Sequence, residues 1–295
     1  MPLIGIKEIL TKARRNGYGV LGPLGGNLEM IIGYVAAAEQ LRAPLILTFN
    51  QEVTPRVPME LGMPLLVSAA RRAAVPVATI LDHGHDLESV VRAIHLGTSS
   101  VMFDGSNLPY EENVRQTKEV VRVAHTLGVD VEAELGRVGG SSIETGVVAV
   151  PSESSDDDND RSMFTDPELA LDFVSRTEID ALAISFGNVH GMYTGEPKID
   201  LDLVREIFSL VEVPLVMHGA SGLADGDYQK IIKSGISKIN YYSAMSRRAV
   251  QDLSDFLVDP GQDEVAYHNI IDHSIEFFRE DTMNVMALMG CVEVV

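Results

Sequence analysis

The sequence predicts an α/β fold, a (β/α)8 TIM barrel that forms a single domain over residues 1–295. Eight short apolar runs alternate with longer amphipathic segments, which is the pattern of strands and helices in a parallel sheet. A doubly wound sheet more often stops at roughly five or six strands, so the count favours a closed barrel. The length of 295 residues accommodates a barrel of about 250 residues and additional segments.

Each predicted strand is an apolar run of four to six residues. The strands are expected at Gly19–Gly22, Pro44–Phe49, Pro76–Leu81, Ser99–Phe103, Asp130–Leu135, Ala181–Ser185, Pro214–Met217 and Ile236–Asn240. The intervening segments have helical periodicity, as from Leu28 onward and over Glu111–Thr126. Thr165-Asp166-Pro167 is a helix start, with a capping residue before a proline at the first helical position.

Two segments fall outside this alternation. After the fifth strand, residues 136–166 are rich in Gly, Ser and Asp and include the polar tract Ser152–Asp160. A loop of this length is a solvated insertion or a mobile lid. The barrel core is expected over about residues 5–260 and a C-terminal helical arm over about 261–295. The apolar residues of that arm would serve an oligomer contact or close the base of the barrel.

Composition excludes several classes of protein. There are 43 acidic and 23 basic residues, which give a formal net charge of −20 at pH 7, so nucleic acid and anionic membranes are poor partners. No apolar run is long enough to span a bilayer, and the first residues lack the pattern of a signal peptide. The single Cys291 cannot form an internal disulfide. We therefore expect a cytoplasmic protein.

Reactive residues follow the predicted strands at their carboxyl ends, where barrel enzymes place their chemistry. His83, His190 and His218 each stand at such an end and next to glycine. Three neutral imidazoles suit a zinc-like ion and leave a position open for substrate. His85 precedes a helix start and is expected in a loop, and the other four histidines lie in helical patterns.

Four carboxylates accompany these histidines. Asp82 directly precedes His83, so the two cannot share a direction in an extended strand; it is either a proton donor and acceptor or a partner that orients a histidine. Asp104 and Glu134 are expected near the metal, as supporting groups or as an alternative metal position. Glu132 and Glu134 share one face of their strand, so at least one of them must find a cation or hydrogen bonds inside the barrel.

Glycine-rich or polar turns follow the last three strands, where barrels commonly bind phosphate through backbone N–H groups. These turns contain Gly191, the segment from Gly219 to Gly222, and the segment from Asn240 to Ser243.

At these residues the sequence resembles the class II, metal-dependent aldolases of ketose phosphates, the fructose- and tagatose-bisphosphate aldolase family. The matching stretches appear in family order over about residues 5–260: Leu81–His83, Met102–Ser106, Val131–Gly140, Ser185–Tyr193 and His218–Gly222.

The resemblance implies reversible cleavage of a ketose 1-phosphate or ketose bisphosphate to dihydroxyacetone phosphate and an aldehyde. It implies that His83, His190 and His218 bind Zn²⁺ and that Asp82 is the catalytic acid/base. A carboxylate on the loop after the fifth strand, for which Glu144 is the nearest candidate, would move the α-proton. The implied substrate-binding residues are Gly191, Gly219, Ala220, Ser221, Asn240, Tyr241, Tyr242 and Ser243. Another divalent metal is an alternative to zinc, a monovalent cation is a possible addition, and the assembly would be a homodimer or homotetramer.

Departures from the family pattern concern the aldehyde side. Pro23-Leu24 replaces the usual Phe-Asn pair, Asn50-Gln51-Glu52 replaces a small hydroxyl residue followed by glycine, and Tyr242 precedes Ser243. The expectation is therefore an atypical aldehyde-side specificity. Two alternatives remain: a non-catalytic homologue that binds sugar phosphates, and a metal-dependent barrel hydrolase suggested by the pair His83 and His85.

Overall fold

A computed structural model describes residues 3–51, 57–139, 161–191, 193, 197–259 and 265–295. Its eight strands are parallel and lie in the order β1-β8-β7-β6-β5-β4-β3-β2. They are β1 (Val20–Pro23), β2 (Leu45–Phe49), β3 (Val77–Gly84), β4 (Ser100–Phe103), β5 (Asp130–Leu135), β6 (Ala181–Ile184), β7 (Leu215–Met217) and β8 (Ile236–Tyr241).

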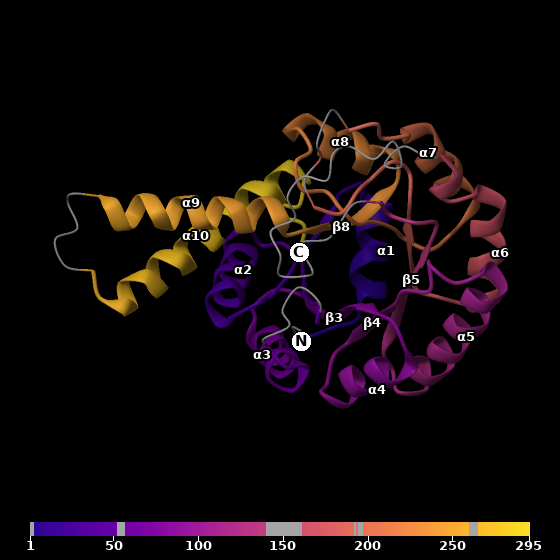
Figure 1. Ribbon diagram of the computed structural model, residues 1–295, viewed down its shortest axis with the longest axis horizontal. Coiled ribbons are helices and arrows are strands. Elements are labelled where there is room, and N and C mark those ends of the chain that lie inside the picture. The colour runs from indigo at the N-terminus through magenta and orange to yellow at the C-terminus, as the bar shows by residue number, and fades with distance from the viewer. Residues whose placement is uncertain (1–2, 52–56, 140–160, 192, 194–196, 260–264) are drawn as a thin grey trace.

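The sheet closes into a barrel between β1 and β2, the two strands at the ends of this order. Leu24 forms an isolated parallel bridge with Thr48, and the Gly25 N–H donates to the Thr48 carbonyl at 2.8 Å. Figure 1 shows the helices arranged around the resulting ring. The predicted (β/α)8 barrel is confirmed, and the strand ends that were expected to meet at one rim do so.

Ten α-helices surround or extend the barrel in the described part of the chain. They are α1 (Ile6–Asn16), α2 (Leu28–Leu41), α3 (Met59–Arg72), α4 (Leu87–His95), α5 (Tyr110–Thr126), α6 (Pro167–Thr177), α7 (Leu201–Leu210), α8 (Asp225–Ser234), α9 (Ser243–Val258) and α10 (Tyr267–Leu288). Short polar side chains cap several of them. Asp166 accepts from the N–H groups of Glu168 and Leu169 before Pro167 opens α6, as the sequence predicts.

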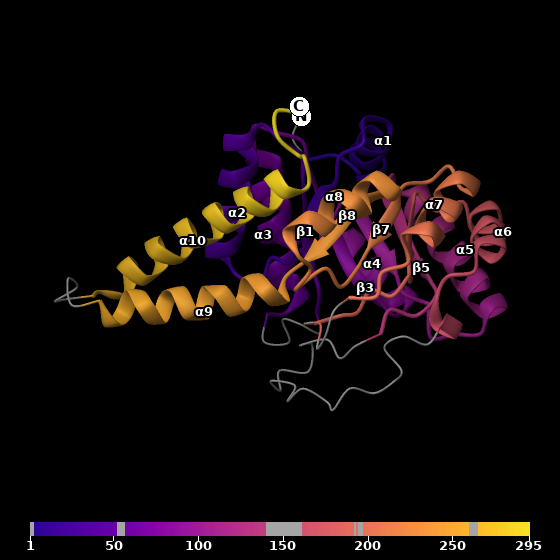
Figure 2. The same ribbon diagram turned by 90° about the horizontal axis from the view of Figure 1, so that it is seen from above.

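The C-terminal arm is helical and consists of two helices. Figures 1 and 2 show α9 and α10 projecting together from the barrel, so the arm includes α9, which precedes residue 261. The second half of α10 returns to the barrel and buries Phe278, Val285 and Met286. Gly33 of α2 allows this approach, since a Cβ there would lie 2.7 Å from the Ile275 carbonyl oxygen. No helix among the described residues is both long and apolar enough to cross a membrane.

Candidate active site and metal centre

Six of the eight strands contribute to one pocket at their carboxyl ends. It is lined by Gly22, Leu24, Thr48, Asn50, Asp82, His83, His190, Gly191, His218, Gly219, Ala220, Ser221, Asn240, Tyr241, Tyr242 and Ser243. All the predicted metal ligands, Asp82 and the eight predicted substrate-binding residues are therefore in one place. Leu24 and Asn50, which the sequence marked as departures from the family pattern, also line it, and Gly22 and Thr48 are additional lining residues that the sequence motifs did not single out.

Asp82 and His83 both face this pocket because β3 is irregular at its end. The register of β3 against β4 shifts between Leu81 and Gly84, and His83 has φ +49°. Adjacent residues of a regular strand point to opposite faces. The expectation that these two side chains diverge is therefore wrong. A left-handed backbone at a non-glycine residue costs about 1–3 kcal/mol, and it brings a carboxylate and an imidazole to the same cavity.

The loops after β6 and β7 place the other two histidines. The His190 N–H donates to the Gly139 carbonyl at 2.8 Å, which ties this loop to the segment that follows β5. The Asn188 side-chain amide donates to the His218 carbonyl at 2.9 Å, and its oxygen accepts from the Phe186 N–H at 2.8 Å. Asn188 therefore connects the two histidine-bearing loops.

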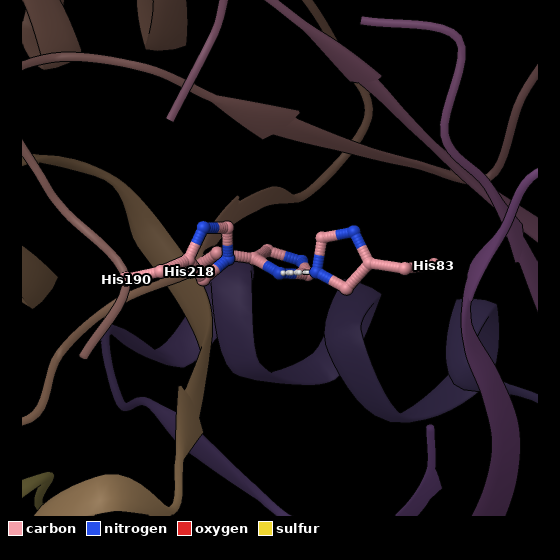
Figure 3. Close-up of side chains that lie close together, drawn as sticks. All are labelled: His83, His190 and His218. Carbon is pink, nitrogen blue, oxygen red and sulfur yellow. Dashed lines mark hydrogen bonds between the residues drawn. The ribbon is translucent and has the colours of Figure 1, made fainter. Parts of the chain in front are cut away.

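The three imidazoles converge (Figure 3). His83 Nε2 lies 3.0 Å from His218 Nδ1, and one nitrogen from each of the three rings lies within 4.8 Å of the others. His190 Nε2 is buried without a hydrogen-bond partner. A buried unpaired nitrogen beside two closely opposed ring nitrogens fits a tetrahedral N₃ site for a zinc-like ion.

Carboxylates contact two of these rings through the nitrogen that does not face the other imidazole. Asp104 Oδ2 lies 2.7 Å from His83 Nδ1, and Glu132 Oε1 lies 3.0 Å from His218 Nε2. Such contacts set the orientation and tautomer of a ligating histidine. Asp104 also accepts from the backbone N–H and the hydroxyl of Ser106, at 3.0 and 2.6 Å.

The metal-free site has an uneven distribution of protons. Burial, together with the neighbouring imidazoles of His83 and His218, lowers the pKa of His190 to about 3. Burial also opposes the charged form of His83, but the carboxylates of Asp82, Asp104 and Glu134 outweigh it and raise the pKa of His83 to about 10. The negative charge of the carboxylates thus stabilises a positive charge at this place.

Asp82 is 7% exposed and receives a hydrogen bond at Oδ1 from the Asn240 side-chain amide, at 3.0 Å. Burial alone would raise the pKa of Asp82, but His83, followed by His218, Lys238 and His190, holds it below its usual range. Asp82 is therefore an ionised carboxylate, fixed in direction, beside the three histidines.

Glu132 and Glu134 have different surroundings although they share one face of β5. Glu132 finds a cation, as the sequence required of at least one of them, since the Lys238 ammonium lies 2.7 Å from its Oε2. Glu134 Oε2 is buried without a partner, and burial, reinforced by Asp104, raises the pKa of Glu134 to about 8. Glu134, Asp104 and His83 lie close enough to form a second possible metal group. Asp104 and Glu134 thus remain predicted both as supporting groups and as an alternative metal position.

The remaining predicted residues lie outside the pocket or outside the described part of the chain. His85 is exposed and lies just before the Asp86 cap of α4, as expected for a loop histidine. Glu144 and most of the predicted lid lie outside the described residues. The sequence motifs missed Lys238, although it is two residues before Asn240 on β8 and so shares its face.

Comparisons with known proteins identify the family of the chain. The family model described as "Fructose-bisphosphate aldolase class-II" matches residues 4–293. The chain is 40% identical over 240 residues to a sulfofructosephosphate aldolase of Alkalicoccus urumqiensis, covering 81% of this chain and 80% of the relative. It is 41% identical over 244 residues to the D-tagatose-1,6-bisphosphate aldolase subunit GatY of Klebsiella oxytoca, covering 81% of each.

Among solved structures, the crystal structure of the YdjI aldolase from Escherichia coli K12 superimposes with a TM-score of 0.84 at 32% identity, covering 98% of both chains. The fold, the strand-end motifs and these matches lead to one conclusion: the chain belongs to the class II fructose-bisphosphate aldolase family.

Proposed function

We propose that this aldolase reversibly cleaves a ketose 1-phosphate or ketose bisphosphate to dihydroxyacetone phosphate and an aldehyde, with zinc held by His83, His190 and His218. The observation that carries the proposal is the convergence of three imidazoles beside Asp82 in one pocket. When bound there, zinc would supply Lewis-acid stabilisation of the negative charge that develops as the carbon–carbon bond breaks. The family is zinc-dependent; another divalent metal, and an added monovalent cation, remain predictions.

Asp82 is the proposed acid/base. It takes the proton of the C4 hydroxyl during cleavage and returns that proton during condensation. Its low pKa keeps it ionised near neutral pH, as a base must be, and Asn240 fixes its direction. Glu144 remains the proposed carboxylate for the α-proton.

The phosphate of the dihydroxyacetone half is assigned to the turns after β6, β7 and β8. Gly219 has φ +69°, and Ser221 Oγ accepts from the Ala244 N–H at 3.2 Å, so the β7 turn leans on the start of α9. Ser243 is the first residue of α9, where N–H groups and the helix dipole favour an anion.

The aldehyde half is where this enzyme departs from an ordinary fructose-bisphosphate aldolase. Leu24, Asn50 and Tyr242, which mark the departures in sequence, all line the pocket. This placement supports a substrate whose far end is not an ordinary glycolytic phosphate.

A substrate panel tests the proposal. The zinc-loaded protein is incubated with fructose 1,6-bisphosphate, tagatose 1,6-bisphosphate and a series of ketose 1-phosphates, and release of dihydroxyacetone phosphate is followed with a coupled reductase. We expect cleavage of at least one ketose 1-phosphate to exceed that of fructose 1,6-bisphosphate. Efficient turnover of fructose 1,6-bisphosphate would overturn the specificity, and zinc binding without any cleavage would overturn the aldolase activity.

The assembly is proposed as a homodimer or homotetramer. The α9–α10 arm exposes Val250, Val258 and Tyr267 to more than two thirds of their accessible area, at 71%, 74% and 76%. Sedimentation analysis tests this assignment, and a monomer at micromolar concentration would contradict it. The cytoplasmic location remains a prediction from the sequence.

A further inference from the structure

A buried ion pair lies inside the barrel, directly behind one of the proposed metal ligands. Lys238 Nζ of β8 lies 2.7 Å from Glu132 Oε2 of β5, and both side chains are fully buried. The other oxygen of the same carboxylate, Oε1, lies 3.0 Å from His218 Nε2. One carboxylate therefore joins an ammonium group and an imidazole.

Core stability does not account for this pair. Removing two charges from water costs several kcal/mol per ion, and well-packed apolar residues of similar volume are often neutral or stabilising replacements. The barrel also makes room for the pair. A Cβ at Gly22 of β1 would lie 3.2 Å from Lys238 Cε and 2.7 Å from Asn240 Oδ1, so any larger residue there would displace the lysine or the asparagine.

We propose that Glu132 and Lys238 form a positioning pair for His218. An ionised carboxylate can only accept, so His218 Nε2 must carry the proton. The lone pair of His218 is then on Nδ1, the nitrogen that faces His83 Nε2 at 3.0 Å. Lys238 holds the second carboxylate oxygen and so prevents Glu132 from rotating away from the ring.

This arrangement differs at the three histidines. His83 contacts Asp104, and the groups that Ser106 donates to Asp104 are neutral. His190 Nε2 has no hydrogen-bond partner. Among the three, His218 is the one whose supporting carboxylate is neutralised by a buried lysine within the described structure. The inference rests on the proposed metal site and deepens it.

Two double variants separate positioning from packing. E132L/K238M removes both charges together, so neither is left buried and unpaired, and it removes the acceptor for His218. E132Q/K238M removes the same charges but keeps a neutral acceptor. Outer-shell partners of a metal-bound histidine typically contribute about 10- to 100-fold in metal affinity. We expect E132L/K238M to bind zinc about 10- to 100-fold more weakly, and E132Q/K238M to fall between it and the wild type.

Asp180 offers a matched control at the opposite end of the barrel. This 2% exposed carboxylate also joins a lysine and a histidine, with Lys7 Nζ at 2.9 Å and His125 Nε2 at 2.7 Å, but it lies outside the pocket. D180N should lower the thermal midpoint and leave zinc affinity unchanged. E132L/K238M should show the reverse, a retained thermal midpoint of the metal-free protein and weakened zinc binding.

Zinc affinity is measured by competition with a chromophoric chelator, and the ligand field by the visible spectrum of the cobalt-substituted proteins. Altered cobalt bands in E132L/K238M, together with the affinity loss, support positioning. Wild-type affinity and spectrum in E132L/K238M would overturn it; should that variant not fold, wild-type affinity in E132Q/K238M would do so. A wild-type protein that binds no zinc would instead overturn the proposed function.

Discussion

A methyl group at Gly219 is expected to disturb both the proposed phosphate-binding turn and a proposed metal ligand. Gly219 has φ +69°, and a Cβ at this position would lie 2.1 Å from the Val189 oxygen, 2.4 Å from the Val189 carbon and 2.9 Å from the His190 nitrogen. These atoms form the peptide bond that leads into His190. Gly219→Ala therefore forces the His190 backbone to move.

The expected loss of unfolding free energy has two contributions. Alanine in a left-handed conformation costs about 1–2 kcal/mol. Relief of the contact with the Val189–His190 peptide adds about 1–3 kcal/mol, the usual cost of overpacking. Gly17 has the same φ of +69°, and a Cβ there would meet nothing within 4 Å, so Gly17→Ala carries the first contribution alone. We expect Gly219→Ala to lose about 2–5 kcal/mol of unfolding free energy and Gly17→Ala about 1–2 kcal/mol.

Zinc affinity and KM should differ between the two variants more than their stabilities do. Misplacing a reacting or binding group by about 1 Å can cost about 100-fold. Gly219→Ala should lose zinc affinity and raise KM for the cleaved ketose phosphate, whereas Gly17→Ala should keep both. Urea unfolding of the metal-free proteins gives the stabilities, and chelator competition gives the affinities. Equal losses in the two variants, or wild-type zinc affinity in Gly219→Ala, would refute the reasoning.

Three further predictions concern the titratable groups. Asp82→Asn keeps the shape and the contact with Asn240 but cannot accept the hydroxyl proton, so kcat should fall about 10²- to 10⁴-fold with zinc content unchanged; a wild-type rate would exclude Asp82 as the base. His190→Ala should abolish stoichiometric zinc in elemental analysis, whereas His95→Ala, at the end of α4, should retain it, and equal zinc in both would argue against the triad. Glu134 has a folded pKa near 8, above its ordinary 4.5, so the metal-free protein should lose up to about 1.4 kcal/mol of stability per pH unit as pH rises between these values. Urea titrations at about pH 5 and pH 8 should show a flatter pH dependence in Glu134→Gln, and an unchanged slope would contradict the assignment.

The sequence predicted the barrel because each strand can be recognised from its own short stretch of residues. Apolar runs of four to six residues mark where parallel strands begin and end, and closure brings their carboxyl ends to one rim. The convergence of His83, His190 and His218 followed from that geometry without knowledge of any contact. The strand limits agree to within a residue or two, except at β3, which extends to Gly84.

The structure adds what depends on contacts across the barrel. The common direction of Asp82 and His83 requires a left-handed backbone at His83, a conformation that is uncommon for any residue other than glycine and that the apolar pattern of the strand does not indicate. Lys238 stands in an apolar run and would ordinarily be read as an exposed residue of a strand. Its burial depends on Glu132, more than one hundred positions away, and on the space left by Gly22.

The charges of the site bear on how so acidic a chain would hold the proposed sugar-phosphate substrate. With a net charge of −20, the overall field repels a sugar phosphate. Around the histidines lie four carboxylates: Asp82, Asp104 and Glu132 are ionised, whereas Glu134, whose pKa is about 8, stays largely protonated near neutral pH. The charged His83 and the Lys238 ammonium offset two of these three negative charges, so the metal-free pocket keeps a net negative charge. The metal-free pocket is therefore unfavourable for an anion. A dication bound by neutral imidazoles reverses this local balance, and backbone N–H groups at Gly191 and in the Gly219–Ser221 turn can then hold the phosphate without adding lysine or arginine. Metal binding should accordingly precede substrate binding, since the carboxylates that attract the cation are the groups that would otherwise repel the sugar phosphate.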